Sequence, residues 1–181
     1  MRKLLIVLLA FIGFSSASHA QDFTIRFGPE LTLAPGFDFG INGQFIGKNL
    51  ARFDSGISLG LAGNVSINFV NGVGFGVIAG PTVNFDLGLG RGDVYVGLGL
   101  GVFGGGGGAQ FVFGFLSGVQ YQVTNGVNLF SNLGLIVVPG VAGTLELGAD
   151  FNVSRAIDLY TKLIVGFRGS FGLGVGLTFR T

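Results

Sequence analysis

The sequence predicts an all-β protein: a transmembrane, antiparallel, up-and-down β-barrel of eight to ten strands. Most segments alternate large apolar residues with small or polar ones, and a period of two is typical of a β-strand whose side chains point to opposite faces. Glycine supplies 36 of the 181 residues and phenylalanine 20. Only 10% of residues are charged, against about 25% in a typical soluble domain, so the composition favours a lipid environment.

The first twenty residues have the features of a cleaved export signal, and the barrel domain is predicted to span residues 21–181. Arg2 and Lys3 form a basic start, an apolar run follows, and Ser18 and Ala20 are small residues suited to cleavage. The run is shorter than the roughly 20 apolar residues that a membrane-anchoring helix needs. Cleavage leaves eight basic and nine acidic side chains, so no basic surface for nucleic acid is expected.

Ten segments of the mature chain are predicted to be strands because turn signals separate them. Pro35-Gly36, Asn71-Gly72 and Pro139-Gly140 are typical turn dipeptides. The five glycines at 104–108 are predicted to form a loop, and residues 47–54 are expected to be the most charged connection. The predicted strands are residues 23–34, 37–46, 55–70, 73–86, 94–103, 109–123, 127–138, 144–153, 157–167 and 170–181.

The last segment shows the alternation most clearly. Phe171, Leu173, Val175, Leu177 and Phe179 share one phase, and the residues between them are glycine or threonine. In a soluble sandwich the apolar phase would face a core. Because nearly every segment repeats the pattern, we expect a sheet closed on itself with the large apolar side chains facing lipid.

Charged residues test the predicted phase independently of the apolar residues that set it. Nine charges inside the predicted strands, and Arg168 one residue beyond the ninth strand, all lie on the phase opposite to the large apolar side chains. A cation on the lipid face of a barrel costs about 2–4 kcal/mol at the bilayer midplane, whereas acids and bases inside the barrel can pair. Four bases and six acids leave an excess of acid, so a pore here would favour cations. The predicted lumen-facing charges are Arg26, Glu30, Asp38, Asp86, Glu146, Asp150, Asp158, Lys162, Arg168 and Arg180.

Most glycines inside the predicted strands also lie on the inward phase, and two explanations apply to them. The interior of a barrel of about eight strands is just wide enough for its side chains, so glycine would relieve crowding and curvature. Alternatively, the missing side chains would leave a water-filled lumen. The geometric explanation is the favoured one.

The sequence offers little catalytic chemistry. It contains no cysteine, and its single histidine, His19, lies in the predicted signal. Glu146 and Asp150 share one face of a strand, where they fit partners of interior bases better than a catalytic pair. Residues 99–104 match a dinucleotide-binding fingerprint, but that motif needs a following helix and a strand is predicted instead. No enzyme, cofactor or metal site is therefore predicted.

The last strand also carries a recognisable motif, Gly174-x-x-Leu177-x-Phe179. It resembles the C-terminal signal by which the assembly machinery recognises bacterial outer-membrane barrels. In those proteins the aromatic residue is usually the final one, whereas Arg180 and Thr181 follow it here.

Over residues 23–180 the pattern resembles that of small outer-membrane β-barrel proteins of the OmpA/OmpX-like kind. The resemblance implies a location in the bacterial outer membrane, with outer-membrane lipids and the barrel assembly machinery as partners. It also implies eight strands as the common number, against ten from the segmentation above.

Three hypotheses for function remain. The favoured one is a non-enzymatic outer-membrane barrel with a structural or surface role and a largely plugged polar lumen. The alternative is a narrow porin-like channel for small polar solutes or cations. A secreted, glycine-rich, self-assembling β-protein fits the composition, but it explains neither the inward charges nor the extensive outward apolar surface. The oligomeric state is not predicted.

Overall fold

The computed structural model describes residues 22–34, 37–53, 56–69, 73–88, 91–105, 107–138, 140–167 and 169–181. These residues form ten strands: β1 (Phe23–Ala34), β2 (Asp38–Arg52), β3 (Ile57–Asn68), β4 (Gly74–Asp86), β5 (Gly92–Gly105), β6 (Gly108–Thr124), β7 (Val127–Val138), β8 (Ala142–Asn152), β9 (Ile157–Gly166) and β10 (Phe171–Arg180). They include no helix long and apolar enough to cross a membrane. The predicted signal at 1–20, the turns at 35–36 and 71–72, Pro139 and Arg168 lie outside the described residues.

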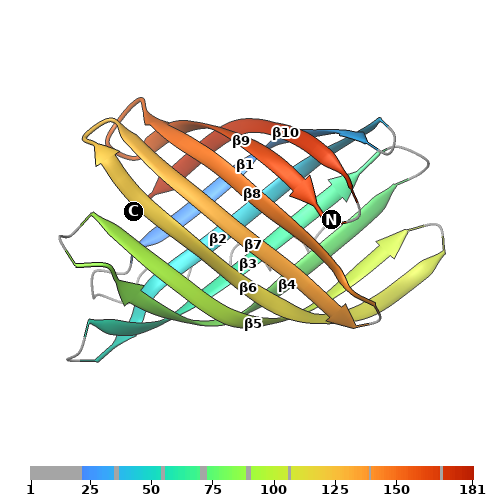
Figure 1. The fold of residues 1–181 in the computed structure, drawn as a ribbon, viewed down its shortest axis with the longest axis horizontal. Coiled ribbons are helices and arrows are strands. Elements are labelled where there is room, and N and C mark those ends of the chain that lie inside the picture. The colour runs from blue at the N-terminus through green and yellow to red at the C-terminus, as the bar shows by residue number, and fades with distance from the viewer. Residues whose placement is uncertain are drawn as a thin grey trace, which may run out of the picture.

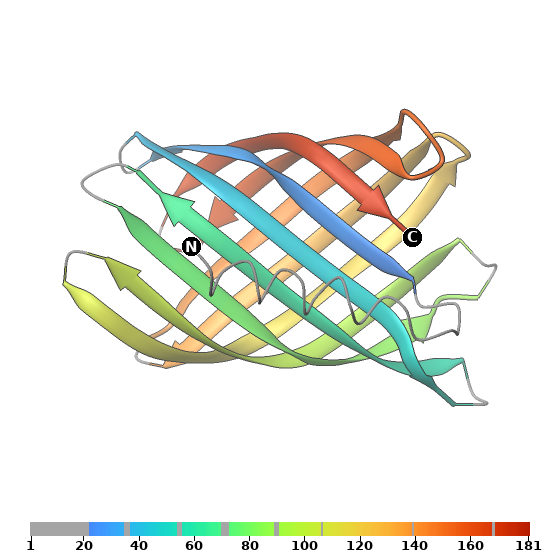
Figure 2. The same ribbon diagram turned by 180° about the vertical axis from the view of Figure 1, so that it is seen from behind.

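The ten strands form one closed antiparallel barrel. Each strand pairs with its neighbours in sequence, and β1 pairs with β10. Figure 2 shows β1 (blue) beside β10 (red) at this seam, where Ile25 lies opposite Phe179 and Glu30 opposite Gly174. The predicted all-β, up-and-down barrel is confirmed with the ten strands of the segmentation. The eight strands implied by the resemblance are wrong, because every predicted segment is a strand and none serves as a connection.

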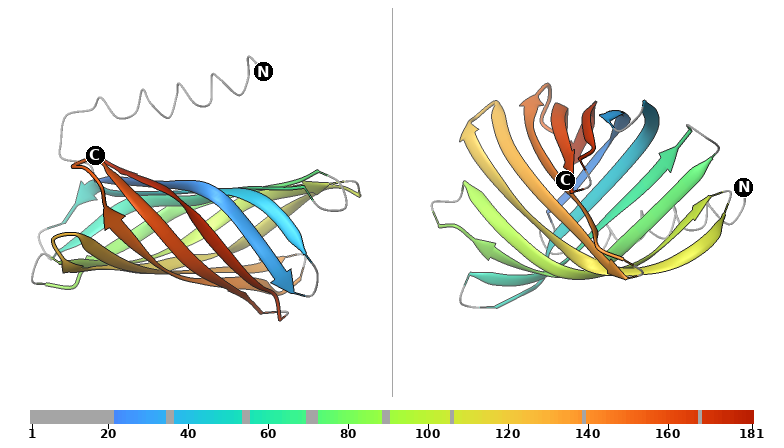
Figure 3. Two further views of the ribbon diagram at one scale, coloured as in Figure 1. Left: turned by 90° about the horizontal axis from the view of Figure 1, so that it is seen from above. Right: turned by 45° about the vertical axis from the view of Figure 1, so that its right-hand side comes forward.

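Both ends of the barrel carry short connections, of two to five residues each. We call the end that holds Phe23 and Arg180 the terminal end, and the opposite end the distal end. The strands are inclined to the barrel axis, so the β5–β6 hairpin reaches beyond its neighbours at the distal rim (Figures 1 and 3). Because neither end has a long loop, the side chains available for function lie in the lumen and at its two rims.

Strand β2 continues through most of the segment that was predicted to be a charged connection. Its register against β3 shifts between Gly47 and Ala51, where three residues of β2 oppose one residue of β3. Such a bulge re-aims a side chain. Asn49 has a φ of 59°, and Lys48 turns into the lumen, where it pairs with Asp93. The prediction failed here because a bulge interrupts the alternation on which it relied.

Three of the five glycines predicted to form a loop, and the two residues before Val94, are also strand. Gly105 of β5 pairs with Gly108 of β6, which leaves a two-residue turn. Gly108 has a φ of 106°, a conformation that residues with a side chain rarely adopt. At its other end β5 begins at Gly92, so Asp93 belongs to the strand instead of the turn.

The outer face of the barrel is apolar. Phe27, Leu100 and Val175 have exposed fractions of 54%, 71% and 54%, whereas the inward Arg26 and Thr178 have fractions of 3% and 0%. This alternation follows the pleat of the strands. A closed sheet with a continuous apolar exterior has the surface that a barrel presents to lipid.

The inner face is less polar than predicted. A buried apolar cluster lies inside β2 to β6, and it occupies positions where both phases of the strand are apolar. The alternation therefore gave no signal that these side chains face inward. The cluster consists of Ile46, Ala62, Ile78, Tyr95, Val112 and Leu116, with Phe103 and Ile136 packed against it.

Inward glycines make room for large inward side chains. A Cβ atom at Gly118 would lie 2.6 Å from the ring of Tyr95, and one at Gly176 would lie 2.7 Å from the ring of Tyr160. Both distances are too short for carbon atoms in contact. This close packing supports the geometric explanation of the glycines at these positions, because rings instead of water occupy the space.

Candidate functional site in the barrel lumen

Nine of the ten predicted lumen-facing charges lie among the described residues. Asp38 lines a cavity at the distal end, and Asp86 lines one at the terminal end. The tenth, Arg168, lies outside the described residues. The other seven form ion pairs with one another inside the barrel: Arg26, Glu30, Glu146, Asp150, Asp158, Lys162 and Arg180.

Arg26 of β1 and Asp150 of β8 form a two-point ion pair in the interior. The Nε of Arg26 donates to Oδ1 of Asp150 at 3.2 Å, and Nη2 donates to Oδ2 at 2.8 Å. The two side chains are 4% and 0% exposed. The guanidinium also lies 3.9 Å from the ring centroid of Phe130, an attractive arrangement for a cation and an aromatic face. Either charge alone would be costly to bury, so each one stabilises the other in the interior.

Lys162 of β9 lies between two carboxylates. Its Nζ is 2.7 Å from Oε1 of Glu146 on β8, and it also forms an ion pair with Glu30 on β1. The Lys162 side chain is 3% exposed. One ammonium group therefore pairs with two carboxylates, which leaves these three side chains with an excess of negative charge. Both glutamates line a cavity at the distal end of the lumen.

Amide hydrogen bonds join opposite walls of the barrel. The Nδ2 of Asn132 donates to Oε1 of Gln44 at 3.1 Å and to Oε2 of Glu146 at 3.2 Å. Asn132 lies on β7 and Gln44 on β2, which are five strands apart around the ten-stranded barrel and therefore opposite. The Oε1 of Gln44 also accepts from Nη1 of Arg26 at 3.1 Å, and the hydroxyl of Tyr95 donates to Asn132 at 2.9 Å.

These contacts form one connected group that we call the central network. It links the Arg26 ion pair to the Lys162 ion pairs through the neutral amides of Gln44 and Asn132. The network therefore crosses the lumen between opposite walls of the barrel. Its members are Arg26, Glu30, Gln44, Tyr95, Asn132, Glu146, Asp150 and Lys162.

Asp150 receives further donors from β10 on the terminal side of this network. The hydroxyl of Thr178 donates to Oδ1 of Asp150 at 2.6 Å. The Nη2 of Arg180 lies 3.1 Å from Oδ2 of Asp150 and 2.7 Å from Oδ2 of Asp158. Asp150 therefore accepts hydrogen bonds from two guanidinium groups and one hydroxyl, which are the kind of partners that a fully buried carboxylate requires.

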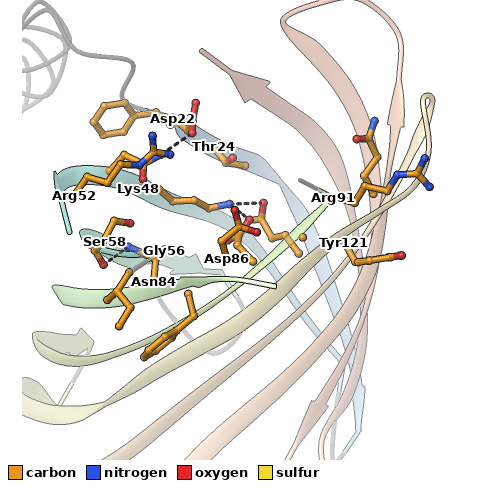
Figure 4. A pocket seen from close by; sticks show the side chains of 18 of the residues that line it. Asp22, Thr24, Lys48, Arg52, Gly56, Ser58, Asn84, Asp86, Arg91 and Tyr121 are labelled. Carbon is orange, nitrogen blue, oxygen red and sulfur yellow. Dashed lines mark hydrogen bonds and ion pairs between the residues drawn. The ribbon is translucent and has the colours of Figure 1, made fainter. Parts of the chain in front are cut away.

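A cavity of about 710 Å³ occupies the terminal end of the lumen. Lys48 enters it from the bulge in β2, with its Nζ 2.5 Å from Oδ2 of Asp93 and 3.4 Å from Oε1 of Gln120. Figure 4 shows Lys48 reaching into this cavity, with Arg52 beside it and Arg91 on the far side. Among the described residues, its charged lining is mixed: Lys48, Arg52, Arg91 and Arg180 against Asp22, Asp86 and Asp93.

A second cavity, of about 380 Å³, occupies the distal end. No described residue lines both cavities. Along β1, Thr24 lines the terminal cavity and Glu30 the distal one, and Arg26 between them lines neither. The central network thus separates the two cavities.

Comparison with models of protein families finds none that matches this sequence. Comparison with curated proteins finds no match either. Solved structures do match. Outer membrane phospholipase A from Escherichia coli is 12% identical, with a TM-score of 0.53 over 90% of this chain and 94% of that chain. The KdgM porin is 8% identical, with a TM-score of 0.51 over 88% of this chain and 98% of that one.

The outer membrane phospholipase dimer of Salmonella typhi is 10% identical, with a TM-score of 0.51 over 86% of this chain and 90% of that one. At such low identity, the likeness to these three structures concerns the fold alone. The chain has the fold of an outer-membrane β-barrel.

The three residues of the predicted assembly signal lie in β10 of this outer-membrane barrel fold. Gly174 faces inward, where a Cβ atom would lie 2.9 Å from Cε of Lys162. Leu177 and Phe179 face outward, each 40% exposed. Arg180, which follows the aromatic residue, pairs with carboxylates inside the barrel. The residue that departs from the usual motif thus has an interior role of its own.

Two possible sites considered in the sequence, a carboxylate pair and a dinucleotide-binding motif, do not have the required geometry in this fold. Glu146 and Asp150 belong to separate ion pairs, with Lys162 and with Arg26, instead of facing each other as a catalytic pair. The glycine motif at 99–104 lies within β5 and is followed by β6, so the strand–helix turn of a dinucleotide site is not formed. The described residues contain no group of three or more His, Cys, Asp or Glu arranged to hold a metal ion.

Several residues of the site were missed by the sequence prediction. Lys48 and Asp93 were assigned to connections, although both are charged and lie two residues and one residue, respectively, from a predicted strand. Gln44 and Asn132 lie on the inward phase, but nothing local distinguishes them from other inward amides. Their importance comes from closure of the barrel, which brings β2 opposite β7.

Proposed function

We propose that this chain is an integral protein of the bacterial outer membrane with a structural or surface role and a lumen closed at mid-height. The observation that carries the proposal is the central network, in which Asn132 and Gln44 join opposite walls and the Arg26 ion pair fills the space beside them. Ions and solutes that enter either cavity meet this barrier of mutually bonded side chains.

Packing inside the barrel supports a closed lumen. Ile46, Tyr95 and Phe130 are 0%, 2% and 3% exposed, so apolar side chains and rings occupy part of the cross-section. A water-filled pore would instead solvate charged side chains along its length. Arg26, Asp150 and Lys162 are almost completely buried, and desolvated charges of this kind are stable when paired.

We propose a non-enzymatic role as well, which the available side chains support. The mature part of the sequence contains no histidine or cysteine, and Glu146 and Asp150 are held in ion pairs. We further propose outer-membrane lipids as partners of the apolar face, and the barrel assembly machinery as a partner of Gly174, Leu177 and Phe179. A relation to OmpA/OmpX-like barrels is part of this proposal. The closed sheet leaves no free strand edge among β1 to β10 for self-assembly.

A narrow porin-like channel for small polar solutes or cations is the second candidate. It is favoured by the two cavities, which approach the central network from opposite ends. Conduction would require the network to move aside. The acidic lining of the distal cavity would then favour cations.

Planar bilayer recordings of the purified full-length protein test the two candidates. The closed-lumen proposal predicts no steady conductance above that of bilayers treated with detergent alone. Stable, small, cation-selective conductance steps would contradict the closed lumen and support the narrow channel instead. Large anion-selective steps would contradict both, because an open lumen of that kind is incompatible with the central network and the acidic distal cavity. Separation of inner and outer membranes, followed by detection of the protein, tests its location.

A further inference from the structure

The distal cavity has two walls of different chemistry. The wall formed by β1, β2 and β3 is polar, and on it Asn42 and Asn64 exchange amide hydrogen bonds at 3.1 and 3.2 Å. The wall formed by β4 to β7 is mainly apolar, with Ile78, Phe103 and Ile136 among its side chains. Apolar side chains inside a barrel gain nothing from lining water. A cavity with one apolar wall and a few polar groups is instead typical of a site for a small organic molecule.

The described charged residues of this cavity have one sign. Glu30, Asp38 and Glu146 are the charged residues among the described part of its lining. The two glutamates share the ammonium of Lys162. Among the described residues, Asp38 has no ion-pair partner, and its buried Oδ1 has no hydrogen-bond partner. A carboxylate oxygen in that position is stabilised by a cationic donor.

We propose that the distal cavity binds a small organic ammonium ion with an apolar body. The ammonium group lies at Asp38, where it supplies the missing donor to Oδ1, and the polar wall beside it carries further oxygen acceptors. The apolar body lies against Phe103 and Ile136 on the opposite side. A volume of about 380 Å³ lies within the usual range for small-molecule sites, about 300–1,000 Å³.

Other ligand classes match this cavity less well. A bare metal ion would make no use of the apolar wall, and no group of metal-binding side chains is found among the described residues. An organic anion would meet three carboxylates. A neutral aromatic molecule would leave Oδ1 of Asp38 without its donor. The expected order of affinity is therefore cation, then neutral molecule, then anion.

The ligand reaches this cavity from the distal rim, so binding does not require passage through the central network. The inference goes beyond the proposed function and is independent of it. Ion conduction by the wild-type protein would contradict the closed lumen. It would not contradict ligand binding in the distal cavity, which the experiment below tests separately.

Isothermal titration calorimetry of the full-length protein in zwitterionic detergent tests the proposal, with 2-phenylethylammonium as the probe. Phenylacetate and 2-phenylethanol serve as anionic and neutral probes of similar shape. Saturable binding of the cation is expected, with weaker binding of the alcohol and none of the acid. Asp38→Asn should weaken cation binding by about tenfold or more, as for a hydrogen bond to a charged group, and leave binding of the alcohol nearly unchanged.

Asp86→Asn is the matched control, because it removes one carboxylate from the terminal cavity. This variant should bind the cation as the wild type does. Phe103→Leu should weaken binding of both the cation and the alcohol, and it gives a second measurement should Asp38→Asn fold poorly. Absence of saturable cation binding would overturn the proposal. Equal binding of phenylacetate, or equal losses in the two aspartate variants, would also overturn it, because uptake by micelles or general charge attraction would then explain the signal.

Discussion

Arg26 and Asp150 meet through two hydrogen bonds inside the barrel, although 124 residues separate them in the sequence. Strand closure brings them together, because β10 and β9 are the only strands between β1 and β8. The pair is not symmetric in its other contacts. Asp150 also accepts from Thr178 and Arg180, whereas Arg26 also donates to Gln44. Removal of one charge therefore has a different consequence from removal of the other.

Asp150→Asn should destabilise the protein more than Arg26→Met does. Loss of the carboxylate removes the charge partner of Arg26 and one partner of Arg180, and an uncompensated buried charge costs about 3–5 kcal/mol. Loss of the guanidinium leaves Asp150 with Arg180 and Thr178, so a smaller cost is expected. Urea unfolding from lipid vesicles measures both free energies. A larger loss for Arg26→Met would show that Asp150 does not organise this group.

Replacement of both Gln44 and Asn132 by glycine should join the two cavities and open the lumen. These amides form the hydrogen bond between opposite walls, and their removal leaves a polar gap that water can fill. We expect the double variant to conduct in planar bilayers, with a preference for cations. The recording compares its step size and reversal potential with those of the wild type.

The matched control replaces Asn42 and Asn64 by glycine. This pair also removes two amides from inward positions, but both lie on the neighbouring strands β2 and β3 and bond only across that wall. It should remain closed. Conduction by both double variants would point to general loosening of the barrel, and conduction by neither would locate the barrier outside the Gln44–Asn132 contact.

The sequence was sufficient for the fold because local alternation determines which side chains face lipid. The phase of the last strand illustrates this: Val175 is 54% exposed and Thr178 is completely buried. Glycine and asparagine turn signals were sufficient for the number of strands. The β2 bulge was not predictable in this way. It breaks the period of two at the point where Lys48 enters the lumen, so the charges around it resembled a solvated connection.

The arrangement of the lumen was harder to predict than the fold. Inward apolar residues such as Ile46 and Leu116 lie beside outward apolar neighbours, so alternation does not assign them. Contacts across the lumen depend on the stagger of ten strands around the barrel, a property that no single segment contains. The charges were correctly expected to need partners, but the particular partner of Arg26 could be identified only from the closed structure.

Val175→Arg should destabilise the membrane-inserted protein, whereas Asn64→Arg should have a milder effect. Val175 lies outward near the middle of β10, where a cation in hydrocarbon costs about 2–4 kcal/mol. Asn64 lines the acidic distal cavity, where a guanidinium gains carboxylate partners in place of its amide contact with Asn42. Denaturant unfolding from vesicles gives the comparison. The reverse order would mean that the apolar face is not the face in contact with lipid.

Cleavage of the export signal should occur after Ala20. The apolar run is short, and Ser18 and Ala20 provide the small residues that a signal peptidase accepts. Mass spectrometry of the protein extracted from membranes should therefore find a chain that begins at Gln21. A mature membrane protein that still contains Met1 would argue against export by this route.

Phe179→Ala should lower the yield of inserted protein more than Leu173→Ala does. Both side chains lie outward on β10 and are exposed to similar extents, 40% and 46%, so loss of lipid contact affects them alike. Phe179 alone occupies the aromatic position of the motif that resembles an assembly signal. Point variants are preferable to truncation here, because removal of Arg180 would also break its ion pairs with Asp150 and Asp158.

The amount of protein in the outer-membrane fraction that resists urea extraction measures insertion, and unfolding of the purified variants measures stability. A specific assembly role requires lower insertion for Phe179→Ala at equal stability. Equal insertion of the two variants would mean that Phe179 acts only as another lipid-facing side chain.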